Sequence, residues 1–274
     1  MKRTLLVINT GSGSADAIGQ DEIARHLTDA GYDIRKIVIL PARDLPTRAE
    51  VEAGGIELVT ILSGDGTVSS LCKKLSGWDG TILPLPGGTM NLLCRKLHGD
   101  VQISELLAAL VRAQMISGPV PVVRAAGFEI LTGLIAGPSS EWGKVREGLR
   151  ERNVASLLQE VPGAWNDTIK GQSMRLLGRE DRYPAIFVEP VSSEVLSVIA
   201  FRADGIGDML GHGIAWLRRD FREGPHDYLG QMSEVTIIDD DLEIGLLVDG
   251  EQQVAKSPLI CQAGMSSVNF MRYK

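Results

Sequence analysis

The chain has 274 residues, of which 44% are hydrophobic and 23% are charged. These proportions are ordinary for a globular protein and exclude the fibrous and disordered classes, while the length allows one large or two modest domains with ample core. The formal net charge of −7 argues against nucleic acid as a partner, because nonspecific affinity for nucleic acid comes from neutralising its phosphates.

The cysteines and the apolar runs bear on the cellular compartment. Cys72, Cys94 and Cys261 are widely spaced and form no C-x-x-C pair, which fits a reducing compartment in which they act as small apolar residues. The apolar run after Met1 is too short for a signal peptide, and no stretch reaches the roughly 18 apolar residues of a membrane span. We therefore expect a cytoplasmic protein whose membrane contact, if any, is peripheral at the inner face.

The first part of the chain alternates short apolar runs with helical patterns. A continuously apolar run such as residues 5–8 is typical of a buried parallel strand. Alternating β and α units of this length predict a parallel sheet with helices on both faces. The expected strands cover residues 5–8, 34–40, 56–62 and 81–85, and the expected helices cover residues 18–27, 47–53, 68–75, 91–97 and 103–115.

The pattern changes near residue 118. Short apolar runs separated by turn residues follow, which predicts an antiparallel β domain. One helical insertion is expected over about residues 140–159. The expected strand regions cover residues 120–126, 128–135, 185–188, 195–201, 235–238 and 242–248.

The first of three unusual segments is Ser-Gly-Asp-Gly-Thr at residues 63–67. A strand, a glycine turn and a helix in succession point free backbone N–H groups at an anion. Gly64 and Gly66 permit positive φ and a close approach to a phosphate, and Thr67 is placed to cap the next helix. Asp65 is placed to bind Mg²⁺ or to accept a proton from an attacking hydroxyl, although an ordinary βα turn explains this segment equally well.

The second segment is Pro-Gly-Gly-Thr-Met-Asn at residues 86–91, after the next strand. Gly88 and Thr89 can offer N–H groups and a hydroxyl, and Asn91 can offer a side-chain amide. Ligands of open α/β sheets bind at the carboxyl ends of the strands. Two glycine turns at this edge can close on one polyphosphate, so the pattern predicts a nucleotide site.

The third segment is Asp-Gly-Glu at residues 249–251, between two strand-like runs. An Asp-Gly pair in this context is typical of a tight β-hairpin turn. A functional interpretation adds that Glu251, at the tip of the hairpin, reaches across a cleft between two domains. The pattern by itself leaves both interpretations open.

Together the three segments resemble the motifs of the diacylglycerol kinase catalytic family, which includes sphingosine kinases and bacterial lipid kinases. That family carries an N-P-x-S-G-like loop, then G-G-D-G-T, P-x-G-T-x-N-D-x-A-R and a late D-G-E. The segment around Ala136, with Trp142, Arg146 and Glu147, is also similar to the second domain of the family. The counterparts of the four motifs are residues 9–13, 63–67, 86–95 and 249–251.

The resemblance implies an α/β plus all-β fold. Residues 1–118 are expected to form a nucleotide-binding α/β domain with a parallel sheet, and residues 119–261 an antiparallel β-sandwich that holds the substrate. Residues 262–274 are expected to return to the first domain. The implied reaction is transfer of the γ-phosphoryl group of ATP to a lipid hydroxyl with Mg²⁺, chemistry that depends on positioning and charge neutralisation.

The resemblance also assigns roles to single residues. Asp65 is the leading metal-ligand or base carboxylate, and Glu251 is the second catalytic residue. The nucleotide-binding residues are Asn9, Thr10, Gly64, Gly66, Thr67, Gly88, Thr89 and Asn91.

Three residues depart from the family pattern. Ser63 replaces the first glycine, Thr10 replaces a proline, and Leu92 replaces the acidic residue after the asparagine. The change at Leu92 removes a carboxylate from the second loop and bears on metal binding and rate. We interpret it as a trait of a bacterial branch with a T-M-N-L-L version of the loop.

A later segment combines aromatic and basic side chains, which suit contact with an anionic lipid interface. The alternative is a partly buried helix or loop that covers the sheet. The candidate membrane-contact residues are Trp216, Arg218, Arg219, Phe221 and Arg222.

Two other features are not interpreted as metal sites. The four histidines show no metal-ligand spacing, so they are expected in the core or at the surface. The acidic run at residues 239–241 is expected to be a solvated turn.

Two alternative functions stay open. A kinase of a soluble acceptor, of the NAD kinase type, shares the G-G-D-G-T loop, although residues 86–91 and the late Asp-Gly-Glu favour the lipid branch. A nucleotide-binding regulator without catalysis is compatible with Leu92, although the presence of both Asp65 and Glu251 speaks against it. The sequence does not name the acceptor lipid, the preferred nucleotide or the oligomeric state, so a homodimer also stays open.

Overall fold

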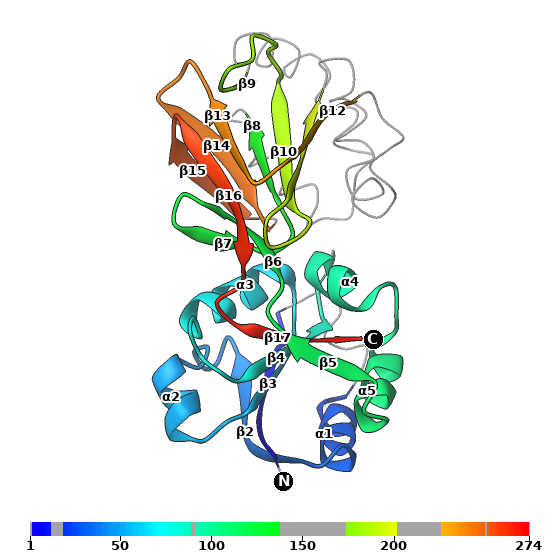
Figure 1. Ribbon diagram of the computed structural model, residues 1–274. Coiled ribbons are helices and arrows are strands. Elements are labelled where there is room, and N and C mark those ends of the chain that lie inside the picture. The colour runs from blue at the N-terminus through cyan, green and yellow to red at the C-terminus, as the bar shows by residue number, and fades with distance from the viewer. Residues whose placement is uncertain are drawn as a thin grey trace, which may run out of the picture. The chain divides into compact units, whose positions relative to one another are not determined.

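A computed structural model describes residues 2–11, 19–88, 91–137, 174–201, 226–249 and 251–273. The chain divides into two compact units (Figure 1). Unit 1 consists of Met1–Val120 and Ser266–Lys274, and unit 2 consists of Pro121–Met265.

Unit 1 is built on a six-stranded sheet with the strand order β2-β1-β3-β4-β17-β5. The first four strands in this order are parallel to their neighbours. The last strand of the chain, β17, lies between β4 and β5, parallel to β4 and antiparallel to β5 (Figure 1). The strands are β1 (Lys2–Asn9), β2 (Tyr32–Leu40), β3 (Leu58–Ser63), β4 (Thr81–Pro86), β5 (Met115–Gly118) and β17 (Asn269–Tyr273).

The helices of unit 1 cover the sheet because its strands are apolar on both faces. Helices α1 and α5 bury their apolar stripes against alternate residues of the sheet, with Leu27 and Leu107 packed near Leu6 and Leu83. Helix α5 ends earlier than predicted, since Ala113 adopts a positive φ of 54° that breaks the helix before β5. The helices are α1 (Gln20–Asp29), α2 (Arg48–Ala53), α3 (Asp65–Lys74), α4 (Leu92–His98) and α5 (Ile103–Val111).

The strand order determines where a ligand can bind to unit 1. From β1 the chain passes to β2 on one side, and then crosses to β3 on the other side of β1. Ligands of open α/β sheets bind at such a switch point, outside the carboxyl ends of the strands. Residues Asn9, Ser63 and Pro86 end three adjacent strands at this edge.

Unit 2 consists of two antiparallel sheets. The six-stranded sheet has the order β12-β11-β10-β8-β14-β15, and the five-stranded sheet has the order β7-β6-β16-β13-β9. The strands are β6 (Pro121–Ala125), β7 (Phe128–Ile130), β8 (Leu134–Gly137), β9 (Arg175–Leu176), β10 (Ala185–Pro190), β11 (Leu196–Phe201), β12 (His226–Met232), β13 (Glu234–Ile238), β14 (Glu243–Val248), β15 (Glu251–Lys256) and β16 (Leu259–Met265).

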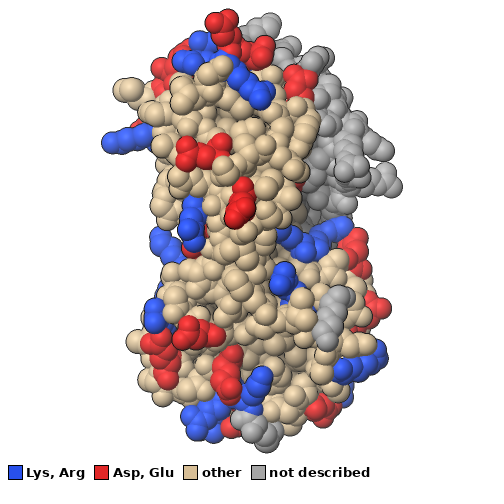
Figure 2. All heavy atoms as spheres, viewed as in Figure 1, with Lys and Arg blue, Asp and Glu red and all other residues tan. Residues whose placement is uncertain are grey.

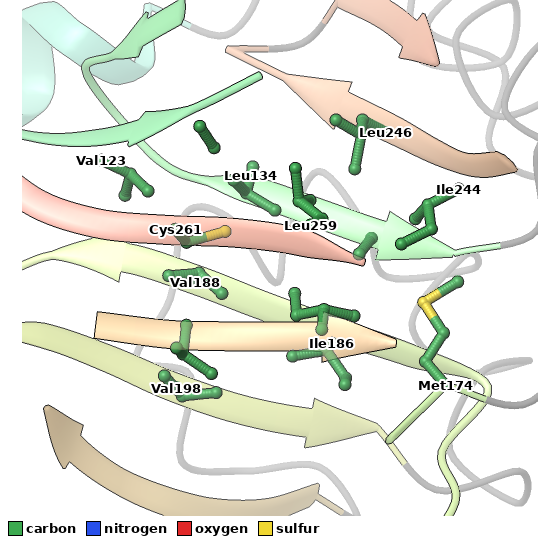
Figure 3. Packing of buried hydrophobic residues seen from close by; sticks show 14 of the residues in the cluster. Val123, Leu134, Met174, Ile186, Val188, Val198, Ile244, Leu246, Leu259 and Cys261 are labelled. Atoms are coloured by element: carbon green, nitrogen blue, oxygen red, sulfur yellow. The ribbon is translucent and has the colours of Figure 1, made fainter. Parts of the chain in front are cut away.

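The two sheets of unit 2 share one apolar core (Figure 3). Ile186 and Leu246 of the six-stranded sheet point into the same layer as Val123, Leu259 and Cys261 of the five-stranded sheet (Figure 3). This arrangement is a β-sandwich, because alternate residues of each strand meet between the sheets. The predicted α/β plus all-β fold class is therefore confirmed.

The six-stranded sheet of unit 2 is apolar on both faces. Ile135, Phe187, Ile199 and Leu247 alternate with core residues along their strands and are also buried. This explains why β8, β10, β11 and β14 read as continuous apolar runs rather than as the alternation of a one-sided sheet. The helical insertion expected near residues 140–159 lies outside the described residues.

The three cysteines are free thiols. Burial raises the pKa of the Cys261 thiol to about 12 and raises that of Cys94 well above its usual range. These thiols therefore stay protonated at neutral pH and pack as small apolar residues, as predicted for Cys94 and Cys261. In the parts of the chain that the structure describes, no helix has the length and apolar character needed to cross a membrane.

Candidate nucleotide-binding site

Asn9, at the end of β1, joins three elements of unit 1. Its Nδ2 donates to the Ser63 Oγ at 3.3 Å and to the Thr67 Oγ1 at 3.1 Å, and its Oδ1 accepts from the Gly11 N–H at 3.0 Å. The side chain therefore links the end of β1 to the end of β3 and the first turn of α3. Its predicted contact with a nucleotide stays a prediction, and the structure adds a positioning role within the protein. The neighbouring Thr10 hydroxyl donates to the Leu40 carbonyl at 2.9 Å.

The β3–α3 turn presents an uncapped helix start. Helix α3 begins at Asp65, and its N-cap residue Gly64 makes no side-chain hydrogen bond to the helix. The first backbone N–H groups of a helix have no partner within the helix, and they lie at the positive end of its dipole. This end of α3 therefore suits an anionic group. The prediction that Thr67 caps this helix is wrong, because Thr67 lies inside the first turn and its hydroxyl accepts from Asn9.

The glycines of the two turns permit a close backbone approach. A Cβ atom on Gly88 would lie 2.5 Å from the Gly64 Cα, and one on Gly87 would lie 2.7 Å from the Ser63 nitrogen. Both distances are too short for any side chain. Gly64 has an ordinary φ of −82°, so its turn does not use the positive φ that we expected. The packing of one turn against the other, rather than a special backbone angle, requires these glycines.

Asn91 closes the β4–α4 turn. Its Oδ1 accepts from the Gly88 N–H at 2.7 Å, and its Nδ2 donates to the Gly88 carbonyl at 2.8 Å. Asn91 has a positive φ of 52°, a conformation in which asparagine is enriched among non-glycine residues. The Gly88 and Asn91 groups expected to hold a nucleotide are thus engaged with each other in this structure. Thr89 lies outside the described residues.

Asp65 connects the two turns. Its Oδ2 accepts from the Leu92 N–H and its Oδ1 from the Leu93 N–H, each at 2.9 Å. These are the first two residues of α4, a helix with no acidic residue in its first turn. Asp65 therefore supplies the carboxylate that stabilises the N-terminus of α4. A carboxylate is also the type of group that binds Mg²⁺ or accepts a proton.

The charge of Asp65 also acts on its surroundings. Burial, and then the nearby Asp65 carboxylate, raises the pKa of the Cys94 thiol on α4. Leu92, which stands where the family has an acidic residue, contributes its N–H to the same carboxylate. The loss of an acid at position 92 therefore leaves Asp65 as the carboxylate that serves this turn.

His98 holds the other end of α4. Its Nε2 donates to the Pro84 carbonyl at 3.1 Å, and the side chain is buried. Burial lowers the pKa of His98 to about 4, against the opposing effect of the Pro84 hydrogen bond. The sequence placed the histidines in the core or at the surface, and the structure shows that His98 is a neutral core residue that anchors α4 to β4.

The Asp-Gly-Glu segment forms the predicted β-hairpin. Val248 of β14 pairs with Glu251 of β15, which leaves residues 249–250 as a two-residue loop. The Asp249 carboxylate does not point outward as a ligand group: it accepts hydrogen bonds from Leu131 and Thr132. Sequence reasoning missed Thr132, since it carries no motif and lies 117 residues away from Asp249.

The structure thus places the predicted site residues in two groups. Unit 1 brings together Asn9, Asp65, Thr67, Gly88 and Asn91 with their two turns at one edge of the sheet. Glu251 belongs to unit 2, so its joint action with Asp65 stays a prediction. The predicted membrane-contact residues Trp216, Arg218, Arg219, Phe221 and Arg222 lie outside the described residues.

The acidic run at residues 239–241 is only in part the solvated turn that we expected. Asp240 and Asp241 are exposed, but Asp239 is buried. Its backbone N–H donates to the Ser257 hydroxyl, and burial raises its pKa. Among the described residues, no cluster of three or more His, Cys, Asp or Glu side chains is arranged to hold a metal ion.

Comparison with known proteins identifies the N-terminal part of the chain. Residues 3–122 match the model of the diacylglycerol kinase catalytic domain, which supports a kinase-family function. A search of curated proteins found no match.

Solved structures match the fold over the full length. A crystal structure of a "putative diacylglycerol kinase" from Bacillus anthracis strain Sterne has a TM-score of 0.63 and 19% identity, covering 100% of this chain and 95% of its own. A second structure, of a diacylglycerol kinase from the same strain, has a TM-score of 0.59 and 17% identity, covering 100% and 97%. At these identities the likeness concerns the fold. Over residues 3–122, the chain matches the diacylglycerol kinase catalytic domain in sequence, and over its full length it shares the fold of these structures.

Proposed function

We propose that this protein is an ATP-dependent kinase that transfers the γ-phosphoryl group to the hydroxyl of a lipid. One observation carries the proposal: two glycine turns and Asn9 are locked together at the switch point of the parallel sheet, beside the uncapped start of α3. Phosphates bind at helix N-termini of this kind, because the backbone N–H groups and the helix dipole both attract an anion. The family match over residues 3–122 supports the same reaction class.

The residues of unit 1 have distinct parts in this proposal. The start of α3 holds phosphate oxygens, while Asn9 and Asn91 keep the two turns in place around them. Phosphoryl transfer depends mainly on positioning and on neutralising charge, which backbone N–H groups at a helix start can provide. Glu251 is the second catalytic carboxylate in this proposal, by resemblance to the late D-G-E of the family.

The described residues fit a magnesium ion shared with the nucleotide. Mg²⁺ is usually held by one or two carboxylates together with substrate phosphates. Asp65 offers one carboxylate at this edge of the sheet, beside the start of α3. A bound Mg²⁺ would neutralise charge on the transferred phosphoryl group.

We also propose that the acceptor of the phosphoryl group is a lipid. This proposal is supported by the family match, and by a segment whose aromatic and basic residues suit an anionic membrane surface, with Trp216 and Phe221 beside three arginines. We propose accordingly that the protein works in the cytoplasm, in peripheral contact with the inner membrane face.

A second candidate function is a nucleotide-binding regulator without catalysis. The observation that favours it is the engagement of Asp65, whose two oxygens both accept backbone N–H groups of α4, together with the missing acid at Leu92. In that case Asp65 serves structure alone, and ATP binds without turnover.

The test is transfer of labelled γ-phosphate from ATP and Mg²⁺ into a mixed lipid extract. We expect labelled lipid with the wild type and strongly reduced label with Glu251→Gln or Asp65→Asn. Asp240→Asn serves as the matched control, because it makes the same chemical change at an exposed ion pair with Arg182. Since Asp65→Asn also weakens the cap of α4, its thermal stability is measured in parallel.

The outcomes separate the candidate functions. Label in lipid identifies the acceptor by chromatography. ATP binding without label in any lipid removes the lipid kinase, and label in a soluble acceptor then indicates an enzyme of the NAD kinase type. ATP binding with no transfer to any acceptor supports the regulator.

A further inference from the structure

The turn that carries Glu251 is fastened to a second turn of unit 2. The Asp249 Oδ1 accepts from the Thr132 N–H at 2.8 Å and from the Thr132 hydroxyl at 2.7 Å, and the Asp249 Oδ2 accepts from the Leu131 N–H at 3.2 Å. In return, the Asp249 N–H donates to the Gly133 carbonyl at 3.4 Å. Residues 131–133 and Asp249 are therefore joined in both directions.

The junction between Asp249 and residues 131–133 is buried, and close packing limits which residues fit there. Asp249 is only 5% exposed and has a positive φ of 46°. Gly133 has a φ of 143°, and a Cβ atom there would lie 2.7 Å from the Phe187 ring. A buried donor that loses its acceptor is costly, and buried polar networks are rigid when they are fully satisfied. The two turns are thus held in one arrangement.

Glu251 follows this junction directly. It is the first residue of β15, paired with Val248, and is separated from Asp249 by one residue. Glu251 therefore lies close in the chain to Asp249, which is bonded to residues 131–133. The bonds between Asp249 and Thr132 hold the residue after β14 against residues 131–133, so we expect them to influence the direction of the Glu251 side chain.

We propose that Asp249 and Thr132 are positioning residues that hold Glu251 in its catalytic orientation. The inference rests on the proposed function, in which Glu251 is a catalytic carboxylate. Asp249 thus acts through Glu251 and does not itself contact the substrate. Three hydrogen bonds from residues 131 and 132 engage its carboxylate, so within Asp-Gly-Glu we assign the reactive role to Glu251.

The junction is first tested without any activity measurement. We compare amide hydrogen exchange of wild type, Asp249→Asn and the matched control Asp240→Asn. Loss of protection at the Leu131 and Thr132 amides in Asp249→Asn, with β14 still protected, supports the proposal. Unchanged protection at both amides overturns it, whether or not the protein proves to be a kinase.

The link to Glu251 is tested by a double-mutant cycle on kcat. Asp249→Asn is expected to lower kcat about tenfold or more while KM for ATP is unchanged, because small displacements of a reacting group are costly. In a Glu251→Gln background the same change should have no further effect. Thr132→Val should lower kcat in the same direction, and Thr132→Ser, which keeps the hydroxyl, should restore it.

The results distinguish the two claims. If Asp249→Asn multiplies the effect of Glu251→Gln, or if Thr132→Ser is as impaired as Thr132→Val, the positioning role is overturned. If the wild type transfers no phosphate, the proposed function fails, and amide exchange alone decides whether Asp249 and Thr132 fasten the turn.

Discussion

The two units use an aspartate in the same way but with different support. In unit 1, Asp65 accepts the N–H groups of Leu92 and Leu93; in unit 2, Asp249 accepts those of Leu131 and Thr132. Each carboxylate thus binds two consecutive backbone donors from a neighbouring turn. Both motif aspartates therefore hold one turn against another. Interpreting the motifs only as sets of ligand-binding residues does not reveal this structural role.

The difference lies in what else holds each pair of turns. In unit 1 the same turns are also held by Asn9, by Asn91 and by backbone packing at Gly64 and Gly88. In unit 2 the Asp249 carboxylate is buried and accepts three hydrogen bonds from Leu131 and Thr132. Removing the aspartate carboxylate should therefore lower the free energy of unfolding more in unit 2 than in unit 1.

The charge of the units differs as well. Unit 1 carries 14 Lys and Arg against 13 Asp and Glu, whereas unit 2 carries 14 against 22. On the face shown in Figure 2, charges of both signs are interspersed over unit 1. Because unit 2 is acidic overall, an anionic membrane can attract it only through a local basic segment such as the one proposed at residues 216–222.

The largest effect on stability is expected at Asp249. Asp249→Ala removes the acceptor of buried N–H donors, so we expect the free energy of unfolding of unit 2 to fall by about 3 kcal/mol. Urea unfolding monitored by amide exchange in β14 measures this loss for unit 2 by itself. An unchanged urea midpoint would show that water replaces the carboxylate as acceptor. Unit 2 would then depend no more on its aspartate than unit 1 does.

A comparable effect is expected at His98 as the pH falls. The folded pKa of about 4 lies below the unfolded value of 6.5, so the unfolded chain binds the proton first and stability is lost between these values. We expect the free energy of unfolding of unit 1 to fall by up to about 3 kcal/mol as the pH falls over this range. His98→Gln should flatten the pH dependence of the urea midpoint. A wild-type profile as flat as that of the variant would exclude a buried neutral His98.

A smaller effect is expected where the two turns of unit 1 touch. Gly88→Ala places a Cβ atom 2.5 Å from the Gly64 Cα, and such overpacking costs about 2 kcal/mol. It should also weaken ATP binding, measured by calorimetry. Gly19→Ala is the control, because a Cβ atom there meets nothing within 4 Å. If both variants bind ATP like the wild type, the turns do not form the nucleotide site.

The smallest of these losses is expected at Asp65. Asp65→Ala removes a cap from α4 and should cost about 1 kcal/mol, since caps of this kind are partly exposed. His98 still anchors the other end of the helix through Pro84. Thermal unfolding of unit 1 measures the loss, with Asp240→Asn as a surface control whose exposed ion pair contributes little. A loss at Asp65 equal to that at Asp249 would contradict the contrast drawn between the units.

Local patterns predicted much of the framework. The apolar runs at residues 58–62 and 81–85 became β3 and β4, and the Asp-Gly pair became a two-residue hairpin loop. These succeed because strand and turn preferences depend on neighbouring residues. The cap predicted at Thr67 was wrong, because helix α3 begins two residues earlier, at Asp65, with Gly64 as its N-cap.

The sequence by itself therefore determined the order of strands, helices and glycine turns, and it marked the segments that carry the chemistry. Only the tertiary structure decided how the marked side chains are used. Asp65 bonds to residues 27 and 28 positions away, and Asp249 to residues 117 and 118 positions away. Hydrogen bonds over such separations depend on which strand ends the fold makes adjacent, and local sequence preferences carry no information about that adjacency.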